Sequence, residues 1–414
     1  MPNIDSVSNV LSRLTSPRFH ALGETFFSIV QPQPLREPAL VSVSPATATL
    51  LGVSTDDRSA ILSLCNGGFT EAGMPTLASP LSMVYSGHQF GSYNPRLGDG
   101  RAILLGDIEH NGARFELQLK GAGPTPYSRQ GDGRAVLRSS IREFLCSEAM
   151  HGLGIPTTRA LAIMRSQQAV YREQVEPGAT VLRVSPSHIR FGSFEYFSHT
   201  RQHDALAQLA DFVIKHHYPE CRAADNPYAA LLLAVVTRTA RLIAHWQAVG
   251  FAHGVMNTDN MSILGETFDY GPFAFLDDYN PHFICNHSDH SGRYAFDQQP
   301  SIGLWNCNAL AHALLPLAPV ELLREALQQY QPVMEAEYER LMRAKLGLQT
   351  EQVGDAALMS GLLAVMQQSA VDYTRFFREL SGYPQQVAES SLRDMFIDRV
   401  AFDAWQQQYL ARLQ

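Results

Sequence analysis

The sequence predicts an α+β protein with a β-rich first part and a mostly helical second part. Up to about residue 195, short apolar or alternating segments are separated by Gly, Pro and Asn, as is typical of strands joined by turns. From residue 196 onward, apolar residues recur at helical spacing. Between two of the strand-like segments lies Asn111-Gly112, a strong hairpin signal because a type I′ turn needs positive φ at both residues. We therefore expect two domains, residues 1–195 and residues 196–414.

The composition argues against several classes of protein. Charged residues make up 17% of the 414, and the net charge of -8 disfavours a general binder of nucleic acid or of anionic membranes. The five cysteines include no C-x-x-C pair, so the sequence indicates neither a zinc site nor a disulfide framework. The N-terminus lacks the pattern of a secretory signal, and the most apolar run, residues 229–236, is soon followed by Arg238 and Arg241. We expect a soluble cytoplasmic protein that binds neither nucleic acid nor membranes.

The first hairpin brings a lysine close to a glycine-rich turn. Pairing outward from Asn111-Gly112 sets Lys120 opposite Ile103, with Arg101 on the same face one pleat further along. The turn Gly98-Asp99-Gly100 then lies above the Lys120 ammonium. Glycines let backbone N–H groups approach phosphate oxygens, and the lysine supplies positive charge. A lone G-x-G is weak evidence and a lysine at a strand end is usually only solvated, but the register links the two.

A helix is predicted from Arg134 to His151, because the apolar residues have helical spacing and a Gly and Pro stop follows. Glu143 falls on a different side from the apolar residues. A protein kinase places the glutamate that orients its lysine on such a helix, directly after the lysine strand. The alternative is an exposed ion pair between Glu143 and a neighbouring arginine. The residues expected to face the core are Leu137, Ile141, Phe144, Leu145 and Ala149.

A second hairpin is predicted over residues 168–185, with its turn at Glu176-Pro177-Gly178. Arg183 and Arg190 lie at its exit. A guanidinium suits phosphate because its planar fork donates two parallel hydrogen bonds and keeps its charge. Alone, two arginines would be ordinary surface residues. Beside a nucleotide site they become candidates for neutralising phosphates.

The segment HGVMNTDN, residues 253–260, follows a helix predicted to end at Gly250 and keeps the outline of a kinase catalytic loop, H-R-D-L-x-x-x-N. Val255 stands where the catalytic Asp would be, and Asp259 is the carboxylate placed to take over its role. Asn260 holds the position of the metal-binding Asn, and Asp269-Tyr270-Gly271 that of the D-F-G triplet, whose Asp binds Mg²⁺. Runs of Asn and Asp more often form turns, but the lysine segment upstream favours a nucleotide site.

Four segments, within about residues 80–310, together resemble the SelO (YdiU) family of kinase-fold proteins: LGDGRAILL, LQLKGAGPTPYSRQGDGRAVLRSSIREFL, HGVMNTDNMSILGETFDYGPF and FLDDYNP. The resemblance implies a two-lobed kinase-like fold, with an N-terminal extension and N-lobe in residues 1–195. Residues 196–414 would form a helical C-lobe that carries the metal and catalytic loop. It also implies transfer of AMP from ATP to Ser, Thr or Tyr hydroxyls of proteins, with Mg²⁺ or Mn²⁺ and with release of pyrophosphate.

The resemblance assigns roles to residues that match the family motifs. Asp259 would be the proton acceptor, Asn260 and Asp269 would hold the metal, and Glu143 would orient Lys120. Family members usually continue into a tail with a redox-active cysteine, whereas this sequence has no cysteine after Cys307, so we do not expect that control from these residues. The residues implied to contact the nucleotide are Gly98, Gly100, Arg101, Lys120, Asp132, Gly133, Arg183, Arg190 and Asp269.

Three alternatives remain open at this point. The protein could be an ordinary phosphotransferase with Asp259 as base, or a nucleotide-binding scaffold without catalysis. UMP could also be transferred from UTP. Attack at the α-phosphorus develops charge on the α-phosphate and the departing pyrophosphate. A site supplied with Arg101, Arg183, Arg190 and Lys120 suits that leaving group.

Overall fold

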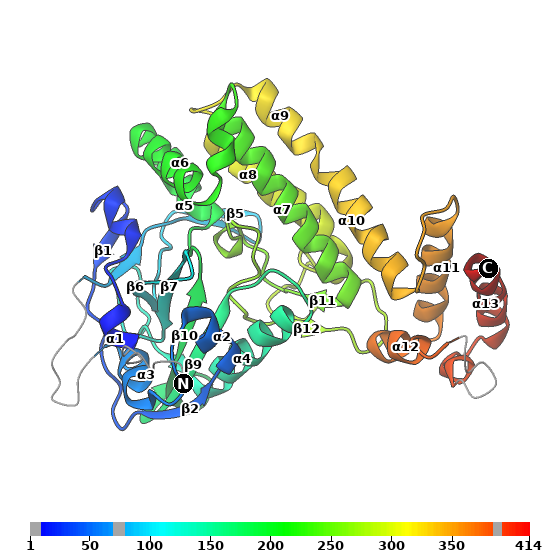
Figure 1. The fold of residues 1–414 in the computed structure, drawn as a ribbon, viewed down its shortest axis with the longest axis horizontal. Helices are drawn as coiled ribbons and strands as arrows, with labels where there is room; N and C mark the ends of the chain where they lie inside the picture. Colours follow the sequence, from blue (N-terminus) through cyan, green and yellow to red (C-terminus); the bar gives the residue numbers. More distant parts are fainter. Residues whose placement is uncertain (1–9, 69–78, 384–390) are drawn as a thin grey trace, which may run out of the picture. The chain divides into compact units, whose positions relative to one another are not determined.

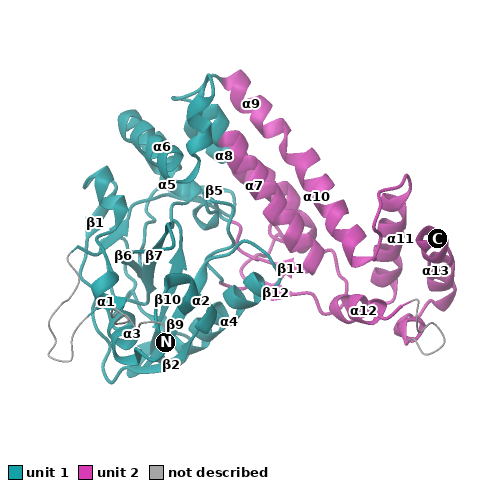
Figure 2. Cartoon of the chain, in the orientation of Figure 1, with its two compact units in different colours: residues 1–231, 257–270, 309–319 teal, residues 232–256, 271–308, 320–414 magenta. Residues whose placement is uncertain are grey.

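The computed structural model describes residues 10–68, 79–383 and 391–414. It divides into two compact units, shown in teal and magenta in Figure 2. The first unit contains residues 1–231, 257–270 and 309–319, and the second contains residues 232–256, 271–308 and 320–414. The first unit combines an antiparallel sheet with several helices, and the second is mostly helical, which confirms the α+β class. The predicted division into lobes at residues 195 and 196 stays a prediction.

The first unit is built on an eight-stranded antiparallel sheet (Figure 1). Its strand order is β1-β3-β6-β7-β10-β9-β2, and β8 also pairs with β10. A separate two-stranded hairpin consists of β4 (Gly87–Gln89) and β5 (Ser92–Asn94). The strands of the large sheet are β1 (Phe27–Ile29), β2 (Ala39–Val43), β3 (Leu81–Met83), β6 (Ala102–His110), β7 (Ala113–Lys120), β8 (Ala135–Val136), β9 (Arg159–Tyr171) and β10 (Val175–Ser185).

The two faces of this sheet differ in chemistry. Leu117 and Leu119 of β7 and Leu182 of β10 belong to an aliphatic cluster that also contains residues of α2 (Pro45–Leu51) and α3 (Arg58–Cys65). Because side chains alternate along a strand, Lys120 and Arg183 lie on the opposite face. The sheet therefore collects its charged side chains on the face away from the aliphatic cluster.

The register predicted for the first hairpin was wrong at its far end. Near the Asn111-Gly112 turn the pairing is as expected, but a β-bulge between Leu104 and Gly106 shifts it by one residue, so that Lys120 pairs with Ala102. A Cβ on Gly106 would lie 2.4 Å from the Thr15 carbonyl oxygen, because the N-terminal segment bonds to the strand here. The bulge follows from this remote contact.

The turn of the second hairpin was also misplaced. Val175 pairs with Tyr171, and the Arg172 N–H donates to the Gln174 carbonyl across the turn at 3.0 Å. The segment Glu176-Pro177-Gly178 lies inside β10, where the register breaks between Pro177 and Ala179. Pro and Gly mark an irregularity within the strand, a position where sheets tolerate them.

The helix α4 (Leu137–Gly152) begins three residues later than predicted, because Ala135 and Val136 form β8. Its buried face was predicted wrongly in part. Leu137, Ile141 and Phe144 pack against a small apolar cluster as expected. However, Ala149 is exposed and Leu145 is 61% exposed, while Glu143 and its neighbours on the same face are buried. This polar face includes Ser140 and Ser147.

The loop of residues 257–270 is tied into the first unit by backbone bonds. The Phe191 N–H donates to the Met261 carbonyl at 2.9 Å and the Thr158 N–H to the Thr267 carbonyl at 3.0 Å. Its first turn is the short helix η3 (Thr258–Asn260), which lies against α5 (Phe191–His199) and β4. The remaining helices that lie wholly in this unit are α1 (Val10–Arg13), η1 (Arg18–Leu22), α6 (His203–His217) and η2 (Pro219–Ala223).

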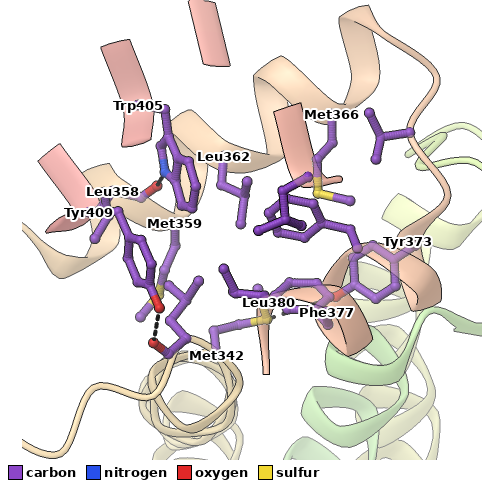
Figure 3. Packing of buried hydrophobic residues seen from close by; sticks show 14 of the residues in the cluster. Met342, Leu358, Met359, Leu362, Met366, Tyr373, Phe377, Leu380, Trp405 and Tyr409 are labelled. Carbon is purple, nitrogen blue, oxygen red and sulfur yellow. Dashed lines mark hydrogen bonds between the residues drawn. The ribbon is translucent and has the colours of Figure 1, made fainter. Parts of the chain in front are cut away.

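The second unit has a large aromatic and aliphatic core (Figure 3). Trp405 Nε1 donates to the Leu358 carbonyl at 3.0 Å, and the Tyr409 hydroxyl to the Leu346 carbonyl at 2.9 Å. Its elements are β11 (Phe251–Ala252), β12 (Ala274–Phe275), η4 (Phe296–Gln298), α9 (Val320–Gln328), α10 (Tyr330–Lys345), α11 (Asp355–Gln368), α12 (Tyr373–Leu380), η6 (Leu392–Met395), α13 (Arg399–Leu413) and most of α7 (Pro227–Val249) and α8 (Gln299–Leu314).

The long helix α7 begins at the Asn226-Pro227 cap as predicted, and Asn226 Oδ1 accepts from the Ala229 N–H at 2.8 Å. Among the described residues, α7 alone is long and apolar enough to cross a membrane by length and composition. Half of its most apolar window is buried, and the core helix of a soluble protein passes the same test. The cytoplasmic location stays a prediction.

Candidate functional site

A buried cluster of charges lies on the face of the large sheet away from the aliphatic cluster. Lys120 at the end of β7 donates to Glu143 Oε2 on α4, and Arg183 Nε on β10 donates to Glu143 Oε1 at 2.5 Å. All three residues are buried. The strand alternation places the two cations on one face, and the rotation of α4 brings the carboxylate between them.

Two arginines connect this cluster to the loop of residues 257–270. Arg183 Nη2 donates to Asp269 Oδ1 at 2.6 Å, and Arg190 Nη1 donates to Asp269 Oδ2 at 2.8 Å. Arg190 Nη1 also donates to the Asp259 carbonyl at 2.7 Å. Asp269 has φ 60°, a left-handed conformation that is uncommon outside glycine and is held here by both arginines. Arg183 and Arg190 thus join the Asp269 carboxylate and the Asp259 carbonyl of the loop to the cluster around Glu143.

Arg190 lies between two aromatic rings, 4.4 Å from the Tyr85 centroid and 4.6 Å from that of Phe268. Its Nη2 is 3.8 Å from Asp99 Oδ1, in the centre of the glycine-rich turn. Gly98 has φ 104°, and a Cβ there would lie 2.5 Å from the Tyr127 ring. Only glycine fits that position without a shift of the turn or of the Tyr127 ring.

The charged groups hold one another ionised. Burial raises the pKa of Asp269, but Arg183, Arg190 and Lys120 outweigh it, so its pKa lies well below the usual range. For Glu143 the same balance of burial against Arg183 and Lys120 lowers the pKa. Burial lowers the pKa of Lys120 to about 8, and it stays protonated at neutral pH. The cluster therefore keeps its charges around pH 7.

Asp259 is the least satisfied carboxylate of the site. Its Oδ2 accepts from Gln89 Nε2 at 3.3 Å, whereas its buried Oδ1 has no hydrogen-bond partner among the described residues. Burial raises its pKa to about 6, and Arg190 acts in the opposite direction. A buried oxygen without a partner is rare in folded proteins and marks a position where a ligand can bind.

Four other predicted residues, Asn260, Arg101, Asp132 and Gly133, lie outside the hydrogen bonds described above. Asn260 follows Asp259 directly in η3. Arg101 is exposed, and its backbone carbonyl accepts from the Gly121 N–H at 2.7 Å. Asp132 accepts two hydrogen bonds of 2.9 Å from the Arg172 guanidinium. Gly133 packs against the backbone of Gly123. Among the described residues, Arg101, Asp132 and Gly133 form no hydrogen bond or ion pair with the cluster.

Sequence reasoning missed four residues of the network: Asp99, Gln118, Gln89 and Tyr85. Gln118 Oε1 accepts from Arg183 Nη1 at 3.1 Å, and its Nε2 donates to Asp99 Oδ2 at 3.5 Å. The two-residue spacing from Lys120 placed Gln118 on the same face and could have found it. Gln89 and Tyr85 carry no such signal, because they meet Asp259 and Arg190, respectively, only through the tertiary fold.

An open cavity of about 940 Å³ lies beside this network. Tyr85, whose ring stacks on Arg190, lines it together with Tyr127 and Tyr196. Arg96 and Arg129 also line it and are exposed.

A lysine held by a glutamate, together with two arginines and a loop with two carboxylates, is an arrangement typical of enzymes that act on phosphate groups. The sequence profile of the family "Protein adenylyltransferase SelO" matches residues 9–414. The chain therefore belongs to the SelO/YdiU family, and it is a protein nucleotidyltransferase.

Curated relatives agree over nearly the whole chain. Protein nucleotidyltransferase YdiU of Pseudomonas aeruginosa (strain LESB58) is 56% identical over 400 residues, which cover 96% of this chain and 82% of the relative. The proteins of the same name from Pseudomonas fluorescens (strain SBW25) and Aliivibrio salmonicida (strain LFI1238) are 55% and 53% identical. The alignments cover 96% and 98% of this chain, and 81% and 83% of the two relatives.

Proposed function

We propose that this protein transfers AMP from ATP to a Ser, Thr or Tyr hydroxyl of another protein and releases pyrophosphate, on a two-lobed kinase-like fold. The observation that carries the proposal is the network in which Arg183 and Arg190 bind the Asp269 carboxylate, Arg190 also binds the Asp259 carbonyl, and Glu143 links Lys120 to Arg183. The residues that would neutralise a triphosphate, hold a metal and take a proton all belong to the first unit.

Lys120, Arg183 and Arg190 would neutralise the phosphates. Preorganised cations stabilise charge that develops in a transition state, and three of them suit a departing pyrophosphate. The backbone at Gly98 and Gly100 would approach the phosphates closely, because neither residue carries a Cβ. Further nucleotide contacts would come from Arg101, Asp132 and Gly133.

Asn260 and Asp269 would hold a divalent ion, Mg²⁺ or Mn²⁺. Mg²⁺ prefers oxygen ligands and keeps several waters and substrate phosphates, so two protein ligands suffice. Asp269 is ionised, and each carboxylate oxygen can accept more than the one bond it receives from an arginine. When bound, such an ion polarises the phosphate under attack.

Asp259 would take the proton of the acceptor hydroxyl as the oxygen attacks the α-phosphorus. Its Oδ1 is the atom suited to this role, because Oδ2 already accepts from Gln89. Glu143 would orient Lys120 and would not touch the substrates.

The test uses ATP labelled at either the α- or the γ-phosphate, incubated with the full chain, Mg²⁺ and a mixture of cell proteins. We expect label on protein only from the α position, and label only from the γ position would support a phosphotransferase instead. UTP labelled at the α position, with Mn²⁺, tests the other nucleotide. Asp259→Asn should lose transfer at least about 100-fold, with ATP binding retained in calorimetry. A scaffold would transfer neither label.

A further inference from the structure

We infer that Gln89, on the β4–β5 hairpin, is a positioning residue that orients Asp259 for proton transfer, and that Asn94 fixes the Gln89 amide for this task. The inference rests on the proposed role of Asp259. Gln89 Nε2 donates to Asp259 Oδ2 at 3.3 Å across 170 positions of sequence. This bond leaves Oδ1, which has no hydrogen-bond partner among the described residues, as the oxygen that would accept the proton of the hydroxyl.

The orientation of the Gln89 amide is set within the hairpin. Asn94 Nδ2 donates to Gln89 Oε1 at 3.3 Å, and β4 pairs with β5 so that Gly87 lies opposite Asn94. Because Oε1 accepts from Asn94, the amide nitrogen is the end that points to Asp259. A flipped amide would instead set an oxygen against the carboxylate, which is repulsive.

The hairpin is fixed against the loop by three further contacts. The His88 N–H donates to Thr258 Oγ1 at 2.7 Å, and the Phe90 N–H to Asn257 Oδ1 at 3.3 Å. A Cβ on Gly87 would lie 2.9 Å from Thr258 Oγ1 and 3.1 Å from Asp259 Cβ. The backbone of β4 thus lies directly on the loop, and a displacement of Gln89 would require the hairpin to move.

A buried carboxylate on α5 connects the same elements. Glu195 accepts from Thr258 Oγ1 through Oε2, and His88 Nδ1 is 2.5 Å from its Oε1. Glu195 is 1% exposed, so it has little freedom to choose other partners. Glu195 therefore holds His88 and Thr258, which directly precede Gln89 and Asp259 in the sequence.

Proton transfer depends on the orientation of the base as well as its presence. Without the Gln89 donor, Asp259 can rotate its oxygens, and the productive arrangement is populated for less of the time. We expect Gln89→Leu to lower kcat about 10-fold. The KM and Kd for ATP should not change, because Gln89 makes no contact with Lys120, Arg183 or Arg190 among the described residues.

The experiment compares four variants of the full chain in the labelled-ATP assay. Gln89→Leu and Gln89→Met both remove the donor, the second with the length of the side chain kept, and both should lower kcat. Asn94→Leu frees the Gln89 amide to flip. Its kcat should fall about 3-fold, which is less than the fall expected for Gln89→Leu. Gln174→Leu, in the exposed turn between β9 and β10, is the matched control and should keep full kcat.

Thermal unfolding and ATP calorimetry of each variant separate positioning from a structural role. A kcat within twofold of the parent in Gln89→Leu would overturn the inference, and so would a fall in kcat accompanied by an equal loss of ATP affinity or by a lower Tm. If the Asp259→Asn variant still transfers AMP, Asp259 is not the proton acceptor, and that part of the proposed function is wrong. If Asp259→Asn loses transfer while both Gln89 variants keep it, only this inference fails.

Discussion

Glu143 illustrates how single residues set the character of this site. Its carboxylate lies between Lys120 and Arg183 and is buried. Burying one charge without a partner costs several kcal/mol, whereas a hydrogen-bonded group of opposite charges is tolerated. Removing any one member would therefore leave the others uncompensated.

Glu116 of β7 provides a prediction on stability. It is 5% exposed, and burial raises its pKa to about 8. The folded protein therefore holds a proton that the unfolded chain releases above about pH 4.5. The contribution of Glu116 to stability is complete below that pH and is lost as the pH rises towards 8. Glu116→Gln should raise the free energy of unfolding by about 1–3 kcal/mol at pH 8.5 and by less at pH 5.5.

Urea unfolding at both pH values measures this difference. Glu109→Gln, an exposed carboxylate on the neighbouring strand β6, serves as the control and should show little change at either pH. If the gain in the free energy of unfolding from Glu116→Gln is no larger at pH 8.5 than at pH 5.5, the raised pKa of Glu116 is contradicted.

At this scale the sequence could predict most charged members of the site. Lys120, Glu143, Arg183 and Asp269 stand in motifs, and the structure brings them into contact. Gln89 could not be predicted, because an amide on a short hairpin has no pattern that distinguishes it from a surface residue. Its contact depends on where the tertiary fold places the loop.

Among the elements, the strands of the first hairpin and their turn were predictable from local sequence. The β-bulge was not, because it depends on Gly106 meeting the backbone of Thr15, far away in the chain. The Pro177-Gly178 pair was ambiguous for a related reason. Local turn chemistry cannot tell a hairpin turn from a strand that needs an irregularity to pair with β8.

The glycine-rich turn before β6 allows a prediction at the same scale. Gly98→Ala would place a Cβ 2.5 Å from the Tyr127 ring at a φ of 104°. The turn must shift, and we expect the Kd for ATP to rise about 10-fold, equivalent to about 1.4 kcal/mol. Calorimetric titration of ATP with Mg²⁺ measures the effect.

Gly112→Ala is the matched control for this variant. Gly112 also has positive φ, 75°, but a Cβ there meets nothing within 4 Å. It should lose about 1 kcal/mol of stability through backbone strain, while its ATP affinity stays at the parent value. Equal Kd values for both variants would show that the turn does not contribute to nucleotide binding.

For the whole molecule, the division into two units separates stability from binding. Every contact of the network lies in the first unit, whereas the aromatic core of Figure 3 lies in the second. Leu362 in that core is fully buried. Leu362→Ala should lower the free energy of unfolding by about 2–5 kcal/mol and leave the Kd for ATP unchanged at 20 °C.

Chemical unfolding and calorimetry on the same sample test this prediction. Val353→Ala removes methyl groups from a fully exposed side chain in the same unit and should change neither quantity. A parallel fall of ATP affinity and stability in Leu362→Ala would show that the second unit's core supports the site after all.

The rotation of α4 has a consequence for how the chain reaches its native state. The helix turns Glu143 inward and leaves Leu145 and Leu153 more than half exposed. Before Lys120 and Arg183 are in place, burial of an unpaired Glu143 carboxylate is costly. The helix would then favour a rotation that buries its leucines and leaves Glu143 in water. The native orientation becomes favourable only once β7 and β10 are aligned, so α4 is expected to dock late in folding, guided by charge.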